Sequence, residues 1–315
     1  MTGVVIKSTG SWYWVRTENH RQIQCRIRGK FRTKGIKSTN PLTVGDRVDF
    51  ELEPNTNTGV ITHIHDRKNY IVRKSVKLSK QTHIIAANVD LAFLLVTLDK
   101  PPTFPAFIDR FLATAEAYDI EAVLLFNKID LNNEDLELKK NKLVKIYTDI
   151  GYTCLEISAT EMINIEAVKK LMLGKVSMFS GHSGVGKSTL INAIHPDLDL
   201  KTADVSSLHH QGQHTTTFAE MFALNTEPES YIIDTPGIKG FGVVDFEPDE
   251  ISDFFPEFFA LKSRCKFHNC LHVNEPKCAV KKALENGEVA ASRYRSYLQL
   301  LQGEEENYRT NNYDI

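Results

Sequence analysis

The sequence lacks any long hydrophobic run. None of its 315 residues lies in a stretch that approaches the roughly 18 consecutive apolar residues of a membrane-spanning helix. The N-terminal residues 1–7 also lack the plan of a secretory signal peptide, in which a charged segment precedes an apolar one. The composition, 42% hydrophobic and 25% charged, is that of an ordinary soluble protein. We therefore expect a cytoplasmic protein of two or three domains that contacts no membrane.

Cysteine is scarce as well, and its distribution argues against a disulfide-built fold. The chain has five cysteines, of which Cys25 and Cys154 stand alone. The other three lie within fourteen residues near the C-terminus. In a reducing compartment, such a cluster favours a metal site over disulfide bonds.

A strong excess of one charge is missing from the whole chain, whose formal net charge is −2. The balance is uneven, however. Residues 1–80 carry 16 Lys and Arg against 6 Asp and Glu, whereas residues 245–315 carry 9 against 13. A basic N-terminal segment favours a polyanionic partner held at one end of the molecule. The alternative is that these charges only solvate the surface.

Short apolar and β-branched runs separated by turn signals fill the first 75 residues and predict five strands without a helix. Five such strands favour a small closed barrel, and an OB-fold that binds nucleic acid fits the size, strand number and charge. An SH3-like barrel for protein contacts is the alternative. The expected strands cover residues 4–7, 12–17, 22–27, 47–52 and 59–65. A basic cluster around Phe31 suits a nucleic-acid face: Arg26, Arg28, Lys30, Arg32, Lys34 and Lys37.

A glycine-rich octapeptide fits the phosphate-loop pattern G-x-x-x-x-G-K-[ST]. Its glycines let backbone N–H groups turn onto phosphate oxygens, Lys187 reaches the β- and γ-phosphates, and the hydroxyl of Ser188 can bind Mg²⁺. The helix expected from Thr189 onward turns its positive N-terminal end toward the phosphates. A plain glycine turn between a strand and a helix is the alternative. The octapeptide is Gly181-His182-Ser183-Gly184-Val185-Gly186-Lys187-Ser188.

Two further elements point to guanine. An N-K-x-D tetrapeptide follows the apolar run 122–126, which reads as a strand buried on both faces. The carboxylate of Asp130 can accept from N1–H and the 2-amino group of guanine, a donor pair that adenine lacks. We expect Asn127 to brace this loop and the stem of Lys128 to cover one face of the base. After a strand expected over 153–157, a second element resembles the S-A-K loop of GTP-binding proteins, whose backbone contacts the guanine carbonyl. The two elements are Asn127-Lys128-Ile129-Asp130 and Ser158-Ala159-Thr160.

The segment after the phosphate loop supplies the remaining parts of a GTP site. A polar stretch from residue 201 ends in three threonines, 215–217, where switch I is expected. One of them, for which we favour Thr216, should bind Mg²⁺ in the triphosphate state. A hairpin expected over 218–233 then leads to the D-x-x-G element at 234–237. There Asp234 should hold Mg²⁺ through water, and the N–H of Gly237 should sense the γ-phosphate.

The order of these elements is unusual. In an ordinary GTPase the phosphate loop, switch I and D-x-x-G precede N-K-x-D and S-A-K, but here the last two come first. This order indicates a circularly permuted P-loop GTPase domain of the α/β class. The expected domains are an N-terminal OB-fold over 1–75, the permuted GTPase over 76–243, and a zinc-binding helical domain over 244–315. The permutation places the C-terminal domain directly after D-x-x-G, where it is coupled to the nucleotide state.

The cysteine cluster predicts a zinc site in the C-terminal domain. Together with His272, Cys265, Cys270 and Cys278 form the pattern C-x4-C-x-H-x5-C, a complete tetrahedral ligand set for one structural Zn²⁺. The spacing differs from the usual C-x2-C, and His268 is a possible substitute ligand. The helix expected over 290–301 carries arginines and tyrosines that suit either RNA contact or a packed amphipathic face.

These features together resemble the bacterial small-ribosomal-subunit biogenesis GTPases of the RsgA (YjeQ) family, over essentially the whole chain. The resemblance implies an enzyme that uses Mg²⁺ and hydrolyses GTP to GDP and phosphate. It also implies that the enzyme assists late maturation of the 30S subunit, binds through 16S rRNA and is stimulated by that subunit. We expect it to act as a monomer.

The catalytic group departs from the pattern of Ras-like enzymes. Ras-like enzymes orient the attacking water with a glutamine directly after D-x-x-G, but this chain has Ile238 there. The resemblance assigns the corresponding role to His214, which can orient water by hydrogen bonding beside Lys187 and Thr216. A solvated loop histidine is the alternative. Two rival functions also remain: a non-hydrolysing GTP-regulated RNA-binding adaptor, and a P-loop kinase or ATPase, which Asp130 opposes.

Overall fold

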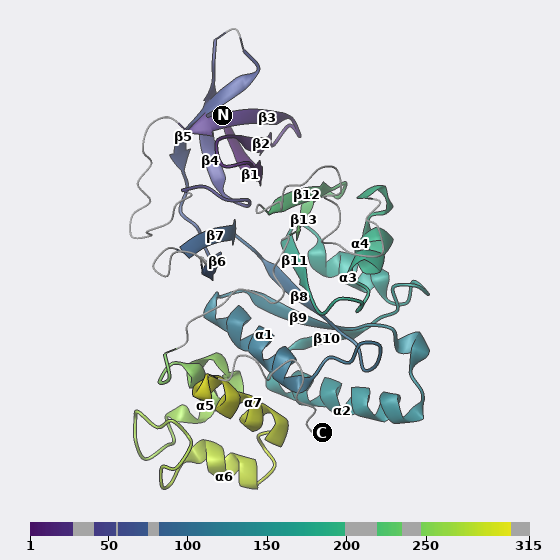
Figure 1. The fold of residues 1–315 in the computed structure, drawn as a ribbon, viewed down its shortest axis with the longest axis vertical. Helices are drawn as coiled ribbons and strands as arrows, with labels where there is room; N and C mark the ends of the chain where they lie inside the picture. Colours follow the sequence, from purple (N-terminus) through teal and green to yellow (C-terminus); the bar gives the residue numbers. More distant parts are fainter. Residues whose placement is uncertain (28–40, 55, 75–81, 199–218, 235–246, 304–315) are drawn as a thin grey trace.

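The computed structural model describes residues 1–27, 41–54, 56–74, 82–198, 219–234 and 247–303. Three parts follow one another along the long axis of the molecule in Figure 1: a strand-rich barrel at the top, a sheet flanked by helices, and a helical module at the bottom. Within these residues, no helix combines the length and apolarity needed to cross a membrane.

The N-terminal part is a closed five-stranded barrel. Strand β1 pairs with both β2 and β4, and this closes the order β1-β2-β3-β5-β4 into a ring in which β3 and β5 run parallel. Alternate side chains point inward, so that Val5, Val15, Phe50 and Ile61 are fully buried. The predicted small barrel is confirmed. Its strands are β1 (Thr2–Ser8), β2 (Tyr13–Thr17), β3 (Gln22–Ile27), β4 (Arg47–Leu52) and β5 (Thr58–Ile64).

The connection after the barrel contains a ribbon that the sequence did not predict. Strands β6 (Tyr70–Lys74) and β7 (Thr82–Ala87) pair antiparallel, and they lie between the barrel and the larger sheet in Figure 1. The side chain of Asn69 fastens the base of the ribbon, since its Nδ2 donates to the carbonyl of Val89 at 2.8 Å and its Oδ1 accepts from the N–H of Val89 at 2.9 Å. The sequence indicated a basic connection here, because lysines and arginines interrupt the alternating apolar pattern that predicts strands.

The central part is a doubly wound sheet with the strand order β10-β9-β8-β11-β13-β12, in which only β12 runs antiparallel to its neighbour. Strand β8 is buried on both faces, as its continuous apolar sequence predicts. Leu94 and Val96 face the core under α1 and α2, whereas Phe93 and Leu95 face the core under α3 and α4. The strands are β8 (Leu91–Val96), β9 (Glu121–Phe126), β10 (Thr153–Glu156), β11 (Val176–Ser180), β12 (Glu220–Leu224) and β13 (Ser230–Asp234).

The helices of this part have identifiable start and stop signals. Helix α1 begins at Pro105, which suits the first helical turn because proline lacks an N–H there. Helix α2 begins after Asn133, whose side chain accepts from the N–H of Leu136, and ends at Gly151 in the left-handed region. The helices are α1 (Pro105–Ala117), α2 (Glu134–Ile150), α3 (Ile165–Met172) and α4 (Lys187–Ile194), with short 3₁₀ turns η1 (Ile129–Leu131) and η2 (Pro196–Leu198).

The barrel and the central sheet are joined. Strand β1 pairs with β12 at Lys7 and Glu220, so that eleven strands form one continuous sheet. Apolar side chains from the barrel and the ribbon, such as Ile6 and Ile71, also enter the core beneath α1 and α2. The two parts therefore share a hydrophobic core as well as a hydrogen-bonded edge.

The C-terminal module packs its own core against α1 (Figure 1). Arg293 is only 1% exposed and donates to Asp109 of α1 at 2.9 Å, while Tyr297 is fully buried. The sequence left two alternatives for the helix expected over 290–301: a packed face or contact with RNA. For Arg293 and Tyr297 the packed face is correct and the RNA contact is wrong, because a buried side chain cannot reach an external ligand. The elements are η4 (Ile251–Phe254), α5 (Pro256–Lys262), α6 (Ala279–Glu285) and α7 (Ala291–Gln302).

Candidate nucleotide and metal sites

The sheet brings the predicted nucleotide loops to one edge. Strands β8, β9, β10, β11 and β13 are parallel, so the loops after their carboxyl ends open on the same side. Those loops include the N-K-x-D tetrapeptide after β9, the 158–160 segment after β10 and the phosphate loop after β11. Ligands of open parallel sheets bind in this position, outside the carboxyl ends of the strands.

The phosphate loop has the backbone that its glycines predict. Gly181, Gly184 and Gly186 all have positive φ angles, of 143°, 85° and 97°. The loop ends at the start of α4, whose first residue is Lys187. The ammonium of Lys187 lies over the loop, donating to the carbonyls of Gly181 at 2.6 Å and His182 at 3.1 Å. The loop thus presents a positive charge and a helix N-terminus together, which suits phosphate.

Asn127 connects three of the predicted loops. Its Nδ2 donates to the carbonyl of Val185 in the phosphate loop at 2.8 Å, and its Oδ1 accepts from the N–H of Ala159 at 3.1 Å. The side chain is 4% exposed, so these bonds are shielded from water. A methyl group on Gly186 would lie 2.5 Å from the same Nδ2. The glycine is therefore required both for its φ angle and for the approach of Asn127.

Replacing Gly186 by alanine is expected to weaken GTP binding by at least about tenfold, because the added methyl group must displace Asn127 and the residue must keep a left-handed φ. Isothermal titration with GTP measures the change. Gly151→Ala is the matched control, since Gly151 also has a positive φ but has nothing within 4 Å of its added carbon. Equal GTP affinities in the two variants would contradict this role for Gly186.

The N-K-x-D loop lies against the phosphate loop. Lys128 adopts a left-handed backbone, with φ of 64°, and its ammonium donates to the carbonyls of Gly184 and Lys100, both at 2.7 Å. Ile129 is half-buried and Asp130 is exposed in the 3₁₀ turn η1, where the carboxylate is open to a ligand. The chain thus holds Lys128 in place and leaves the Asp130 carboxylate accessible.

The 158–160 segment is a tight loop beside this tetrapeptide. Ser158 is fully buried and exchanges two backbone hydrogen bonds with Ile163, at 3.2 and 3.0 Å. Its hydroxyl accepts from the N–H of Glu161 at 3.1 Å and lies 3.2 Å from that of Thr160. Ala159 is 6% exposed and is bound to Asn127 as described above. Hydrogen bonds within the protein therefore define the conformation of this segment.

Two contacts near the phosphate loop were not predicted from the sequence. The ring of His182 lies 4.0 Å from the ring of Phe107, which comes from α1. The loop after β8 also turns back, with the Thr97 hydroxyl donating to the carbonyl of Pro101 at 2.5 Å, and Pro101 lies beside Gly184. The paired prolines that follow the end of β8 after four residues were the available sequence signal for this turn.

Several predicted residues fall outside the described part of the chain. His214, Thr216 and Gly237 belong to this group. Asp234 ends β13, and its backbone pairs with Glu220 of β12. The magnesium ligand predicted on α4, Ser188, is 7% exposed at the first turn of that helix, and Thr189 follows it.

The four predicted zinc ligands lie together in the C-terminal module. The ligand atoms of Cys265, Cys270, His272 and Cys278 are all within 4.8 Å of one another. The Nδ1 atom of His272 lies 3.3 Å from the Sγ of Cys278 and 3.7 Å from that of Cys265. His268, the alternative ligand, is exposed and is not in this group. Such spacing fits one tetrahedral ion with zinc–sulfur bonds of about 2.3 Å.

The protein around the cluster keeps the histidine neutral and places backbone N–H groups on two of the sulfur atoms. Burial raises the pKa of the Cys270 and Cys278 thiols and lowers the pKa of His272, so that the imidazole is neutral and able to bind a metal. The backbone N–H of Lys281 donates to the Sγ of Cys278 at 3.4 Å, and that of Ala279 to the Sγ of Cys265 at 3.3 Å. These N–H groups would stabilise thiolates once an ion is bound.

Comparisons with known proteins agree on one family. The model of the RsgA GTPase matches residues 64–244, and that of the RsgA N-terminal domain matches residues 2–61. The small ribosomal subunit biogenesis GTPase RsgA of Flavobacterium johnsoniae is 63% identical over 99% of this chain and 96% of its own. The protein of the same name from Christiangramia forsetii is 61% identical over 99% of both chains.

Solved structures give the same result. The crystal structure of YjeQ from Thermotoga maritima has a TM-score of 0.78 at 36% identity and covers 96% of this chain and 97% of its own. The structure of YloQ, described as a circularly permuted GTPase, has a TM-score of 0.75 at 31% identity, covering 99% of this chain and 96% of its own. The fold and the order of the nucleotide loops thus define a circularly permuted P-loop GTPase. The chain belongs to the RsgA GTPase family.

Proposed function

We propose that this protein is an enzyme that hydrolyses GTP to GDP and phosphate and acts in the biogenesis of the small ribosomal subunit. The observation that carries the proposal is the arrangement around Asn127, which ties the phosphate loop to both guanine loops. Full-length relatives at 61–63% identity bear the name of a small ribosomal subunit biogenesis GTPase. A small-molecule kinase or ATPase has no support from this family.

The nucleotide contacts follow from the loops. Lys187 and the phosphate-loop amides would hold the β- and γ-phosphates, while Asp130 would bind the guanine edge. Ser188 and Asp234, with Thr216, would hold Mg²⁺, which neutralises charge that develops on the phosphates. The exposed Asp130 carboxylate and the fixed Lys128 support this assignment.

For hydrolysis we assign the water-orienting role to His214. Ile238 stands where Ras-like enzymes have their glutamine, and its side chain can neither donate nor accept a hydrogen bond. The segment that carries His214 would adopt its catalytic arrangement on the ribosomal subunit, so that intrinsic turnover is slow. Lys187 and Thr216 would act beside it on the phosphates.

The remaining parts serve as binding modules. The barrel, within an N-terminal domain over 1–75, would bind 16S rRNA through the basic charge of its segment. The GTPase domain would span 76–243. The C-terminal domain over 244–315 would be held together by one structural Zn²⁺, which the four clustered ligands support. We further propose that the protein is a cytoplasmic monomer.

The test is GTP turnover by the purified protein, alone and with purified small ribosomal subunits, with ATP as the control nucleotide. Turnover specific to GTP and stimulated by the subunits is expected, and His214→Ala should abolish the stimulation while GTP affinity stays nearly unchanged. Binding to subunits without turnover would support the adaptor instead. A His214→Ala variant that responds fully to subunits would remove that residue from the mechanism.

A further inference from the structure

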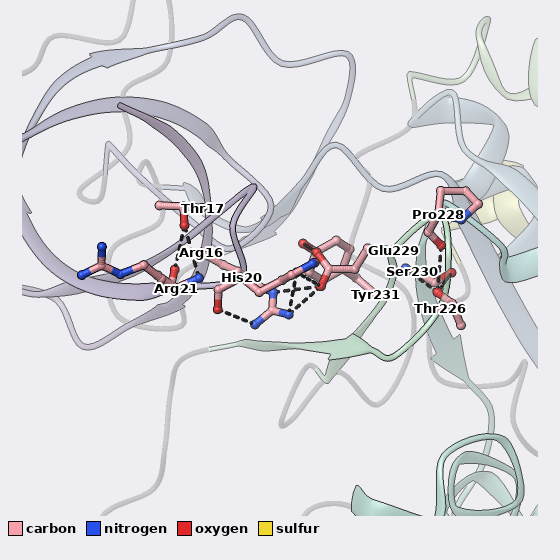
Figure 2. Close-up of polar contacts among 9 residues, drawn as sticks. All are labelled: Arg16, Thr17, His20, Arg21, Thr226, Pro228, Glu229, Ser230 and Tyr231. Atoms are coloured by element: carbon pink, nitrogen blue, oxygen red, sulfur yellow. Dashed lines mark hydrogen bonds and ion pairs between the residues drawn. The ribbon is translucent and has the colours of Figure 1, made fainter.

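Glu229 lies where the barrel meets the β12–β13 hairpin, and it binds both. Its Oε1 accepts from Nε of Arg16 at 3.0 Å and from Nη2 of Arg16 at 2.6 Å, and it lies 3.0 Å from Nδ1 of His20. Its Oε2 accepts from the hydroxyl of Tyr231. Figure 2 shows the Arg16 side chain reaching from the barrel to this carboxylate. One side chain of the hairpin therefore holds three groups from two parts of the molecule.

The contact is ionised and largely shielded from water. The Glu229 and Arg16 side chains are 21% and 14% exposed. Burial alone would raise the pKa of Glu229, but the hydrogen bonds from Arg16 and Tyr231 outweigh burial and hold it below its usual range. Such a shielded, charge-assisted contact is stronger than an exposed ion pair. The interaction is suited to transmit a displacement from one part to the other.

On the barrel side, Arg16 is fixed by the strands around it. It is the last residue but one of β2, where it pairs with Val4 of β1 and Gln22 of β3. Its Nη1 also donates to the carbonyl of His20 at 3.3 Å. A change in the position of the barrel must therefore move the guanidinium with it.

On the hairpin side, the turn that carries Glu229 is closed by hydrogen bonds. The hydroxyl of Thr226 donates to the carbonyl of Pro228 and accepts from the N–H of Ser230, at 2.8 and 2.9 Å (Figure 2). The hydroxyl of Ser230 in turn accepts from the N–H of Gly174 at 2.9 Å. The turn is thus fastened to the residues that precede β11, the strand of the phosphate loop.

Strand β13 connects this turn to the nucleotide edge. It runs from Ser230 to Asp234, so that about 17 Å of extended chain separates Glu229 from the D-x-x-G aspartate. At the nucleotide end of the hairpin, Glu220 pairs with Lys7 of β1 at 3.0 Å. The barrel therefore holds the hairpin at both ends, and the more exposed Lys7 pair is the weaker contact.

We propose that Glu229 is a positioning residue for GTP hydrolysis, coupling the position of the barrel, through Arg16, to the β12–β13 hairpin and so to Asp234. A ribosomal subunit that binds the barrel would act on hydrolysis by this route. The inference rests on the proposed function, because it concerns turnover that the subunit stimulates. Among the residues that the structure describes, neither Glu229 nor Arg16 forms a hydrogen bond or ion pair with the N-K-x-D, 158–160 or phosphate loop, so we expect both to act through the strand.

The experiment compares Glu229→Gln with the exchanged pair Arg16→Glu/Glu229→Arg in GTP turnover titrated with small subunits. For Glu229→Gln, the ratio of stimulated to basal turnover is expected to fall about tenfold, a coupling of about 1.4 kcal/mol, while the half-saturating subunit concentration stays within about twofold. The exchanged pair should recover most of the wild-type ratio of stimulated to basal turnover. Glu121→Gln is the matched control, because it removes one carboxylate at the first residue of β9, where Glu121 pairs with Lys175, and leaves the barrel contact intact.

Amide hydrogen exchange of the free protein gives an independent readout. Glu229→Gln should speed exchange in β13 as far as Ile233, and Glu121→Gln should not. The inference is overturned by an unchanged ratio, by a loss that appears only as weaker subunit binding, or by an exchanged pair no better than the single variant. If the wild-type protein is not stimulated at all, the proposed function fails instead. In that event unchanged exchange in β13 overturns the coupling, and faster exchange supports it.

Discussion

Replacing Arg293 by methionine is expected to lower the free energy of unfolding of the C-terminal module by about 3–5 kcal/mol, because it leaves a buried carboxylate without its cation. The Arg293 guanidinium donates to Asp109 of α1 at 2.9 Å and to both carboxylate oxygens of Glu257, at 2.7 and 3.0 Å. It also lies 4.4 Å from the ring of Phe255. Methionine fills similar space but supplies none of these hydrogen bonds. Hydrogen exchange in α7 measures the loss.

The pH dependence of the stability of this variant shows whether the unpaired Asp109 carboxylate causes the loss. Burial raises the pKa of Asp109 and Arg293 opposes the rise, so removing Arg293 should raise this pKa further. The folded variant then binds a proton that the unfolded chain releases above about pH 4, and its stability must fall as the pH rises through neutrality. The loss in free energy of unfolding relative to the wild-type protein should therefore be smaller at pH 5 than at pH 8.

Two further variants complete this test. Arg293→Met/Asp109→Asn should recover part of the stability, because the asparagine is neutral and can keep the hydrogen bond with Tyr147. Lys282→Met, which removes an exposed positive charge from α6, should change the stability by less than about 0.5 kcal/mol. A deficit that is independent of pH and equal in the Lys282 variant would contradict the buried ion pair.

The nucleotide loops could be predicted from sequence because the functional residues of each loop lie in one short, continuous segment. The glycines of the phosphate loop require positive φ angles, and a lysine and a serine must follow at fixed spacing. Asn127 could be expected to brace its loop, and it bonds both neighbouring loops. The contact of His182 with Phe107 could not be foreseen, because it joins segments 75 residues apart whose approach depends on how α1 packs.

Charged residues limited the sequence prediction in two places. Alternating apolar residues predict a strand, but lysines and arginines around β6 and β7 gave that segment the composition of a loop. Arg293 and its neighbours were equally compatible with an RNA surface, since charge pattern alone does not reveal which face is buried. The face that is buried is determined by its partner on α1, Asp109, and that partner is 184 residues away in the chain.

Removing the proposed Zn²⁺ is expected to unfold the C-terminal module while the barrel stays folded. His272, Cys270 and Cys278 are 0%, 3% and 6% exposed, and the two cysteines belong to the module's apolar core. The carbonyl of His272 accepts from the hydroxyl of Tyr294 at 2.7 Å, so the ligand segment also fastens α7. Zinc binding to such a site supplies about 10 kcal/mol or more of folding free energy, which exceeds the stability expected of this small core.

Two probes separate the parts in this experiment. Chelation followed by gel filtration should remove one equivalent of zinc, reduce the helical circular dichroism signal and make α5–α7 sensitive to protease. Tryptophan fluorescence should stay unchanged, because both tryptophans, Trp12 and Trp14, belong to the barrel. Cys278→Ser should reproduce the chelated state and Cys154→Ser, outside the cluster, should not. A chelated module that keeps its helical signal and protease resistance would contradict the metal's structural role. In that case the buried ion pair with α1, rather than the cluster, would hold the module in place.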